Sequence, residues 1–288
     1  MNLANFNELS HDEAVKLLSA CCASEHWVSQ MVNDRPFANE LAMITAADEI
    51  WYHRCNETDW LQSFEGHPKI GDAKSLAEKF ANTRQMAIGE QAGAILADEN
   101  MLQQLAAANE KYLQKNGFIF IVCATGKSAG EMLHLLQARL QNTKVDEISQ
   151  AMGEQQKITI LRIKKHIHDA QWQQIPISQL TTHVLDTSFG KPAHNMLVKL
   201  YSMNGKAWQS IAQGLTNIDG RVADLLPPVH ILKGGCYKLV FDTSGYYDGL
   251  QIKTFYPEVE IRFTISDASH YHVPLLINPF GYTTYRGS

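Results

Sequence analysis

Hydrophobic residues recur at helical spacing through the first part of the chain. The sequence Ser10–Glu13 is a capping box, in which a serine accepts a backbone N–H and a glutamate reaches back. Leu17, Leu18 and Cys21 then share one face of the helix that this box predicts. The same capping signal recurs at two later places, Ser75–Glu78 and Ser128–Glu131.

Two further stretches extend the helical pattern. Apolar residues keep helical spacing between Pro36 and Cys55, and again from Val145 to about His168. One apolar stretch, Phe118–Cys123, interrupts the pattern and is compatible with a buried extended segment. The first part of the chain is therefore predicted to be all-α.

After Trp172 the pattern changes to short apolar runs, in which β-branched and aromatic residues alternate with polar ones. Four such runs predict strands: Thr181–Leu185, Leu197–Tyr201, Tyr237–Phe241 and Val259–Ile265. Turn signals lie between them: Phe189–Pro192, Met203–Gly205, Asn217–Gly220 and Gly234–Gly235. This spacing is typical of an antiparallel β-sandwich.

Proline marks the same division of the chain. Pro36 and Pro68 are the only prolines before residue 176, and the other seven of the nine follow. A chain of 288 residues is also long enough for two domains. We therefore predict an all-α domain over residues 1–169, a linker over residues 170–179 and an all-β sandwich over residues 180–288.

The overall composition disfavours several classes of protein. A formal net charge of −5 disfavours nucleic-acid binding, and the longest apolar run is far shorter than the ~20 residues that span a membrane. We expect no secretory signal, because no apolar core follows a basic start, and the final Arg-Gly-Ser is not a peroxisomal SKL signal. Five cysteines without a CxxC pair favour neither a disulfide framework nor a thiolate zinc site. A cytoplasmic protein is expected.

The predicted sandwich carries histidines and an arginine in places suited to chemistry. His183 lies in the first strand, Arg221 follows a turn, and His270 and His272 alternate so that they face the same side. A neutral imidazole, with a pKa near ~6.5, can accept a proton, and a guanidinium offers a rigid fork of donors. Such a set can activate a water molecule and stabilise a developing oxyanion without a metal. A zinc site at His183, His270 and His272 is the alternative by ligand type.

The sequences LTTHVLD, TNIDGR, FYPEVEIRF, HYHVPLL and the terminal YRGS resemble the transthyretin-related 5-hydroxyisourate hydrolases over nearly all of residues 180–288. The resemblance implies a transthyretin-like sandwich that assembles into a homotetramer, with active sites in a channel between subunits. It implies catalytic roles for His183, Arg221, His272 and Ser288. It also implies that Tyr285 contacts the substrate. A transthyretin-like carrier of small ligands is the alternative from another functional class.

In the helical region, the sequences GHP, EQAG, NGFIFIVCATGKS and ITILRI resemble the 2-oxo-4-hydroxy-4-carboxy-5-ureidoimidazoline (OHCU) decarboxylases over roughly residues 5–168. The resemblance implies catalytic roles for His67 and Glu90, with His67 moving a proton and Glu90 orienting it. It implies substrate contacts for Pro68, Ala87, Gln91, Phe120, Ile121, Val122, Cys123, Ala124 and Arg162. Arg162 is expected to hold a substrate oxygen, and no cofactor is expected.

Two positions depart from the decarboxylase pattern. Ala87 stands where the family usually has a serine that contacts substrate, and Thr125 stands where an arginine or lysine is often found. A lost hydrogen bond to substrate costs on the order of 1 kcal/mol. A chain with an active hydrolase and a weakened or inactive decarboxylase domain is therefore the alternative to a fully bifunctional one.

The two resemblances imply consecutive reactions. Hydrolysis of 5-hydroxyisourate gives OHCU, and decarboxylation of OHCU gives (S)-allantoin, so we expect a bifunctional enzyme of urate catabolism, a branch of purine metabolism. Its expected partners are these small-molecule substrates and further copies of the chain. Nucleic acid, membrane and metal are not expected partners.

Overall fold

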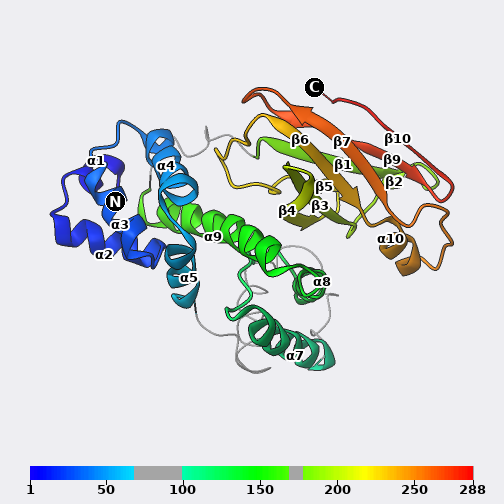
Figure 1. Cartoon of the computed structure of the whole chain (residues 1–288), viewed down its shortest axis with the longest axis horizontal. Helices are drawn as coiled ribbons and strands as arrows, with labels where there is room; N and C mark the ends of the chain where they lie inside the picture. The colour runs from blue at the N-terminus through cyan, green and yellow to red at the C-terminus, as the bar shows by residue number, and fades with distance from the viewer. Residues whose placement is uncertain (68–98, 169–177, 288) are drawn as a thin grey trace.

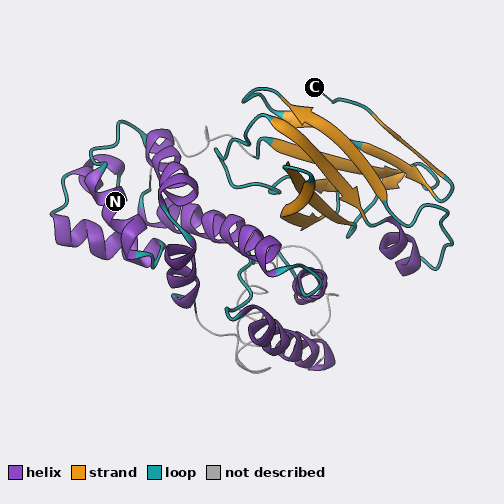
Figure 2. Cartoon of the chain, viewed as in Figure 1, coloured by secondary structure: helices purple, strands orange, loops and turns teal. Residues whose placement is uncertain are grey.

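The computed structural model describes residues 1–67, 99–168 and 178–287 (Figure 1). Helices make up its N-terminal part and strands its C-terminal part, as the hydrophobic pattern predicts (Figure 2). The described helices of the first part are α1 (Leu3–Asn7), α2 (His11–Cys21), α3 (Glu25–Asn33), α4 (Glu40–Glu49), the π-helical turn η1 (Ile50–Arg54), α5 (Glu57–Glu65), α7 (Glu99–Asn116), α8 (Ala129–Arg139) and α9 (Lys144–His166). None of them is long and apolar enough to cross a membrane.

Side-chain caps begin two helices where the sequence predicts them. Both halves of the capping box form at Ser10–Glu13, before α2, and at Ser128–Glu131, before α8. The signal at Ser75–Glu78 lies outside the described residues. The long helix expected from Val145 to about His168 is α9, which differs from that prediction by only one or two residues at each end.

The helix expected between Pro36 and Cys55 is divided. α4 begins only at Glu40, because the Asn39 side chain caps it by accepting the backbone N–H of Ala42. The last turn widens into the π-helical η1. Helical periodicity alone indicated neither the late start nor the change of pitch.

Most side chains of the apolar stretch Phe118–Cys123 are buried, but the stretch forms no strand pairing within the described residues. Side chains fix its backbone instead. Arg139 donates to the carbonyl oxygen of Ile121 at 2.5 Å, and the backbone N–H of Cys123 donates to the Glu154 carboxylate at 2.7 Å. The segment is therefore held between α8 and α9, the helices that carry these two residues.

Two sheets form the C-terminal sandwich. The strands are β1 (Leu180–Asp186), β2 (Lys191–Pro192), β3 (Leu197–Asn204), β4 (Ala207–Leu215), β5 (Arg221–Val222), β6 (Gly235–Phe241), β7 (Val259–Ile265), β8 (Tyr271–His272), β9 (Leu275–Asn278) and β10 (Gly281–Thr284). One sheet has the order β10-β9-β1-β2, with β5 and β8 also paired to β1, and the other has the order β4-β3-β6-β7. The short helix α10 (Thr243–Gly249) follows β6. The four predicted strands correspond to β1, β3, β6 and β7.

Strand β4 was not predicted, because one side of it faces the helical domain. Its Gln209, Ser210 and Gln213 are polar residues that contact the helical domain, so the strand lacks the apolar alternation expected of a sandwich strand. Gln213 donates to the backbone oxygen of Leu135 in α8 at 3.1 Å. A strand that packs against a second domain can therefore lack the alternation of apolar and polar residues from which strands are predicted.

Helix α9 lies between the rest of the helical domain and the sandwich (Figure 1). Gln150 of α9 donates to Ser210 Oγ at 2.6 Å, and the backbone N–H of Ser210 donates to Asp146 at 2.9 Å. His230 of the sandwich lies 3.0 Å from the Asp48 carboxylate of α4. These contacts join the two domains directly. Residues 170–177 of the expected linker lie outside the described residues, so the linker bounds stay a prediction.

Two candidate active sites

The first candidate site is built by strand register. In the antiparallel pairing of β1 with β5, His183 lies opposite Arg221, and in the parallel pairing of β1 with β8, Thr181 lies beside His272. Because Thr181 and His183 are two residues apart on one strand, they share a face of the sheet. Register alone therefore brings Arg221 and both predicted catalytic histidines to the same end of the same face.

Thr181 is a contact point that sequence analysis missed. Its Oγ1 lies 2.9 Å from Nδ1 of His272 and 3.0 Å from Nε2 of His270. His270 and His272 thus face the same side, as the alternation predicts, while Tyr271 between them is buried in the sandwich. The available signal was the register position of Thr181, which becomes visible only once the pairing of β1 with β8 is known.

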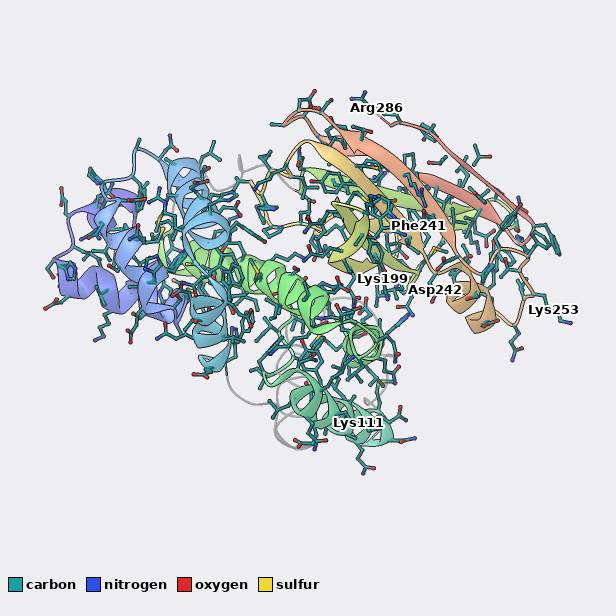
Figure 3. All side chains as sticks on the ribbon, viewed as in Figure 1. Lys111, Lys199, Phe241, Asp242, Lys253 and Arg286 are labelled. Atoms are coloured by element: carbon teal, nitrogen blue, oxygen red, sulfur yellow. The ribbon has the colours of Figure 1, made fainter. Side chains whose placement is uncertain are left out.

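The C-terminal tail returns to His272. The backbone N–H of Gly287 donates to the His272 carbonyl at 2.9 Å. The guanidinium of Arg286, which is labelled near the C-terminus in Figure 3, lies 5.4 Å from the centre of the Tyr271 ring. A Cβ on Gly287 would lie 2.5 Å from Cδ2 of His272, so only glycine permits this approach. Tyr285 is 57% exposed and Ser288 lies outside the described residues, so their roles stay predictions.

Burial and positive charge keep both histidines neutral. Burial, followed by the Arg221 guanidinium, lowers the pKa of His183 below its ordinary 6.5. Burial also lowers the pKa of His272, with further contributions from Arg221, His270 and His183. Nε2 of His183 is buried and has no hydrogen-bond partner in the described part of the chain. The site therefore offers neutral imidazoles beside a permanent positive charge.

The alternative zinc site finds no support in this geometry. Among residues 1–67, 99–168 and 178–287, no group of three histidine, cysteine, aspartate or glutamate side chains is placed to hold a metal ion. His270 and His272 both contact a threonine hydroxyl instead. Neutral imidazoles beside a guanidinium can activate a water and stabilise a developing oxyanion.

The second candidate site lies where α5 ends against α9. Gly66 closes α5, and the next residue is His67. Nε2 of His67 lies 2.6 Å from Oε1 of Gln155, and its Nδ1 lies 3.5 Å from Nη2 of Arg162. Arg162 also donates to the carbonyl oxygen of Cys21 at 3.2 Å, which fixes the guanidinium. His67 and Arg162, both predicted from sequence, are thus neighbours, and Gln155 is an addition.

Several predicted residues of this site cannot be placed. Pro68, Ala87, Glu90 and Gln91 lie outside the described residues. In the segment expected to contact substrate through its backbone, three side chains are buried and two are half-buried: Phe120, Ile121 and Cys123, then Val122 and Ala124. Burial also raises the pKa of Cys123, so its thiol stays protonated.

A buried ion pair supports this segment. Nε of Arg139 donates to the Glu147 carboxylate at 2.6 Å, and both side chains are at most 2% exposed. Tyr112 also donates to Glu147, and the Arg139 guanidinium lies 4.8 Å from the ring centre of Phe120. The pair therefore anchors α8 to α9 beneath the segment.

A cavity of about 550 Å³ lies between the two domains. Glu154 and Lys157 of α9 line it, whereas Gln155 and Arg162 project from another face of that helix, because each residue turns by about 100°. Its wall also includes one residue assigned to each site, Val122 and Arg221. His67 is not among the lining residues, so the described residues do not connect the cavity to His67.

Comparison with known proteins finds a different family for each part of the chain. The OHCU decarboxylase family matches residues 7–164, and the HIUase/Transthyretin family matches residues 180–287. An Arabidopsis thaliana protein, "Uric acid degradation bifunctional protein TTL", is 34% identical over 333 residues, which cover 98% of this chain and 99% of that protein.

Two further proteins are similar, one to the C-terminal domain and one to the whole chain. The 5-hydroxyisourate hydrolase of Mus musculus is 46% identical over 114 residues, covering 38% of this chain and 96% of that protein. A solved structure described as (S)-allantoin synthase is 23% identical and spans 100% of both chains, with a TM-score of 0.45. On the family matches and the full-length Arabidopsis relative, the chain belongs to the family of bifunctional uric acid degradation proteins, which join an OHCU decarboxylase domain to a transthyretin-like hydrolase domain.

Proposed function

We propose that the two sites described above carry the two reactions of this bifunctional enzyme of urate degradation. The sandwich hydrolyses 5-hydroxyisourate to OHCU, and the helical domain decarboxylates OHCU to (S)-allantoin. The observation that carries the proposal is the register of β1, which gathers His183, Arg221 and His272 at one place. Residues in such an arrangement have the proton acceptors and the cation that hydrolysis of a cyclic amide needs.

In the hydrolase reaction, water adds to a ring carbonyl carbon. A neutral imidazole of His183 or His272 accepts the proton of that water, and Arg221 stabilises the negative charge that develops on the carbonyl oxygen. The C–N bond then breaks and the leaving nitrogen takes the proton back. Opening a cyclic amide in this way creates a carboxylate, which is the group that the second reaction removes as CO₂.

In the decarboxylase reaction, the conjugated ring of the substrate accepts the electron pair of the breaking C–C bond. Arg162 holds a substrate oxygen. The carbon that loses CO₂ keeps its hydroxyl and becomes a carbonyl, because His67 takes the proton of that hydroxyl and delivers it to the neighbouring ring carbon, which bears the ureido group. Delivery to a single face makes the product one enantiomer. The contact of His67 with Arg162 at 3.5 Å supports placing both groups at one substrate.

Circular dichroism during urate oxidation tests both assignments in one experiment. Urate oxidase generates 5-hydroxyisourate, and the wild-type chain is expected to give the signal of (S)-allantoin. His272→Ala should slow the decay of 5-hydroxyisourate to the rate without enzyme, as a mere carrier protein also would. His67→Ala should leave that decay fast but give racemic allantoin. Racemic product from the wild-type chain would remove the decarboxylase assignment.

We also propose that the enzyme is a homotetramer built through its sandwich. Exposed aromatic side chains on that domain support a self-association surface, among them Phe255 at 70% and Phe280 at 73% exposure. Phe255 stacks edge-on with Tyr256, and Tyr256 in turn with Tyr282 of β10. Light scattering on the purified chain is expected to give four times the monomer mass, and a monomeric mass would contradict the proposal.

A cytoplasmic location is proposed on the state of the cysteines. All five are free thiols, and four of them are buried. Free buried thiols suit a reducing compartment, where disulfides do not form. Fractionation of cells followed by immunoblotting should find the chain in the cytosolic fraction, and recovery from an organelle fraction would contradict this.

A further inference from the structure

Gln155 of α9 meets the histidine expected to move the proton. Its side chain is completely buried, and Oε1 lies 2.6 Å from Nε2 of His67. The two residues are 88 positions apart in sequence. A buried glutamine at this distance from an imidazole influences the tautomer as well as the position of the ring, because its oxygen only accepts hydrogen bonds.

A second hydrogen bond matches the orientation of the Gln155 amide in which its oxygen faces His67. Nε2 of Gln155 donates to Oγ1 of Thr159, one helical turn later, at 3.1 Å. Thr159 is also buried, at 1% exposure. With its nitrogen turned to Thr159, the amide presents its oxygen to His67. In this orientation the Nε2 atom of His67 carries the proton of its hydrogen bond to Gln155.

Arg162 specifies the same tautomer from the other side of the ring. A guanidinium only donates, so the Nδ1 atom that lies 3.5 Å from Nη2 of Arg162 is the one with the lone pair. A proton on that atom would face the cation. Two contacts from separate residues of α9 thus agree on a neutral imidazole with its proton on Nε2.

We propose that Gln155 is a positioning residue for the decarboxylase, which holds His67 as the neutral Nε2–H tautomer so that Nδ1 exchanges the proton with substrate beside Arg162. This inference rests on the proposed function, because it assumes that His67 acts in the reaction. It adds the atom through which His67 acts and the residue that selects that atom.

The groups around this pair are compatible with a neutral ring. The charged group facing it from α9 is Arg162, and the titratable groups at the adjoining end of α2 are the thiols of Cys21 and Cys22. Burial raises the pKa of Cys21 to about 12 and also raises that of Cys22, so both thiols stay uncharged. The Sγ atom of Cys22 lies within hydrogen-bond distance of Oγ of Ser63 in α5, at 3.2 Å.

The test compares two neighbouring buried glutamines in the full-length chain. Gln155→Met keeps the volume of the side chain and removes the acceptor. Gln156→Met is the matched control, because Gln156 is equally buried and both polar atoms of its amide have no partner among the described residues. OHCU is supplied in situ by urate oxidase and an excess of separate hydrolase.

Gln155→Met is expected to lower kcat of the decarboxylase by roughly 10²-fold, the lower range of what acid–base catalysis contributes, with little change in KM. The hydrolase activity of the same chain should stay at the wild-type level and shows that the protein is folded. Gln155→Glu keeps an acceptor for the Nε2 proton and should restore much of kcat. Its negative charge also raises the pKa of His67, so the acid limb of the kcat profile should move to higher pH.

Three results would overturn the inference while leaving the proposed function intact: a Gln155→Met chain with wild-type kcat, equal losses in Gln155→Met and Gln156→Met, or a change confined to KM. If Gln155→Met does not fold, Thr159→Val decides the matter, since it frees the amide to rotate while keeping Gln155. Wild-type kcat in a folded Thr159→Val chain would then refute the inference. Failure of the wild-type chain to form (S)-allantoin would instead refute the proposed function.

Discussion

Arg221 lies directly opposite His183 in the antiparallel pairing of β1 with β5. The backbone position of Arg221 is therefore set by strand pairing rather than by a flexible loop, and its charge lowers the pKa of both predicted catalytic histidines. A positive charge in an active site stabilises a developing anion. It also lowers the pKa of a nearby imidazole and so changes the pH range in which that imidazole accepts protons.

Replacing Arg221 should shift the pH dependence of the hydrolase. In the wild-type chain the pKa values of His183 and His272 are lowered, so both imidazoles stay neutral, and active, as the pH falls below 6.5. Arg221→Met removes one cause of that lowering, so the acid limb of the kcat/KM profile is expected to move to higher pH, besides the loss of rate. Arg262→Met, on the exposed face of β7, should leave the limb in place. An unmoved limb in Arg221→Met contradicts the argument.

Adding one methyl group at Gly287 should impair the hydrolase. The new Cβ would collide with the His272 ring at 2.5 Å, so the tail or the ring must move. At Gly281 the nearest atom would be an ordinary 3.5 Å away, which makes Gly281→Ala the control. Initial rates of 5-hydroxyisourate decay are expected to fall at least about tenfold in Gly287→Ala only. Equal rates in the two variants would show that the tail does not hold His272.

Thr181→Val should weaken the hydrolase without destabilising the sandwich. The change is nearly isosteric and removes the hydroxyl that contacts His270 and His272. Without this contact the His272 ring is less well oriented toward substrate, so a rate lower by about tenfold is expected. Thr182→Val removes a hydroxyl that donates to Val273 at 2.7 Å, and should lower the melting temperature instead. Loss of stability with an unchanged rate in Thr181→Val would argue for a purely structural hydroxyl.

Breaking the buried ion pair of the helical domain should cost far more stability than any exposed pair. Glu147→Gln leaves the Arg139 charge buried at 2% exposure without its counter-ion, and such changes cost about 3–5 kcal/mol. Denaturant unfolding followed by helical circular dichroism measures the loss. The double change Arg139→Met with Glu147→Leu should recover much of it. A loss below about 1 kcal/mol in Glu147→Gln would mean that water reaches the pair.

Dialysis against a metal chelator should leave both activities unchanged. The proposed chemistry uses imidazoles and guanidinium groups in both domains, and the described residues include no cluster suited to a metal ion. Rates of 5-hydroxyisourate decay and of (S)-allantoin formation are the measurements. An activity that is lost and then restored by a divalent metal would refute the mechanism for that domain.

Local signals in the sequence predicted most of the fold. Capping boxes and apolar spacing act over a few residues, so the starts of α2 and α8, the length of α9 and four strands could be foreseen. Strand β4 could not, because its polar side faces another domain rather than water. The pattern of a strand reports what it packs against, and that partner is outside any local window.

The candidate sites divide in the same way. His67, Arg162, His183, Arg221 and His272 stand in recognisable motifs, and the structure places them in two groups. Gln155 and Thr181 belong to no motif that indicates a catalytic role. Each contacts a histidine that lies 88 to 91 residues away in the sequence. Groups that orient another side chain are defined by the tertiary structure, and register or helix packing must be known before they can be found.

Helix α9 serves both halves of the protein. One face carries Gln155 and Arg162, and another faces β4 with Asp146 and Gln150. The two activities are consequently not interchangeable cassettes. A substitution in this helix selected for one reaction is inherited by the other, and an engineer who wishes to graft either domain elsewhere must redesign the helix as well as cut the chain.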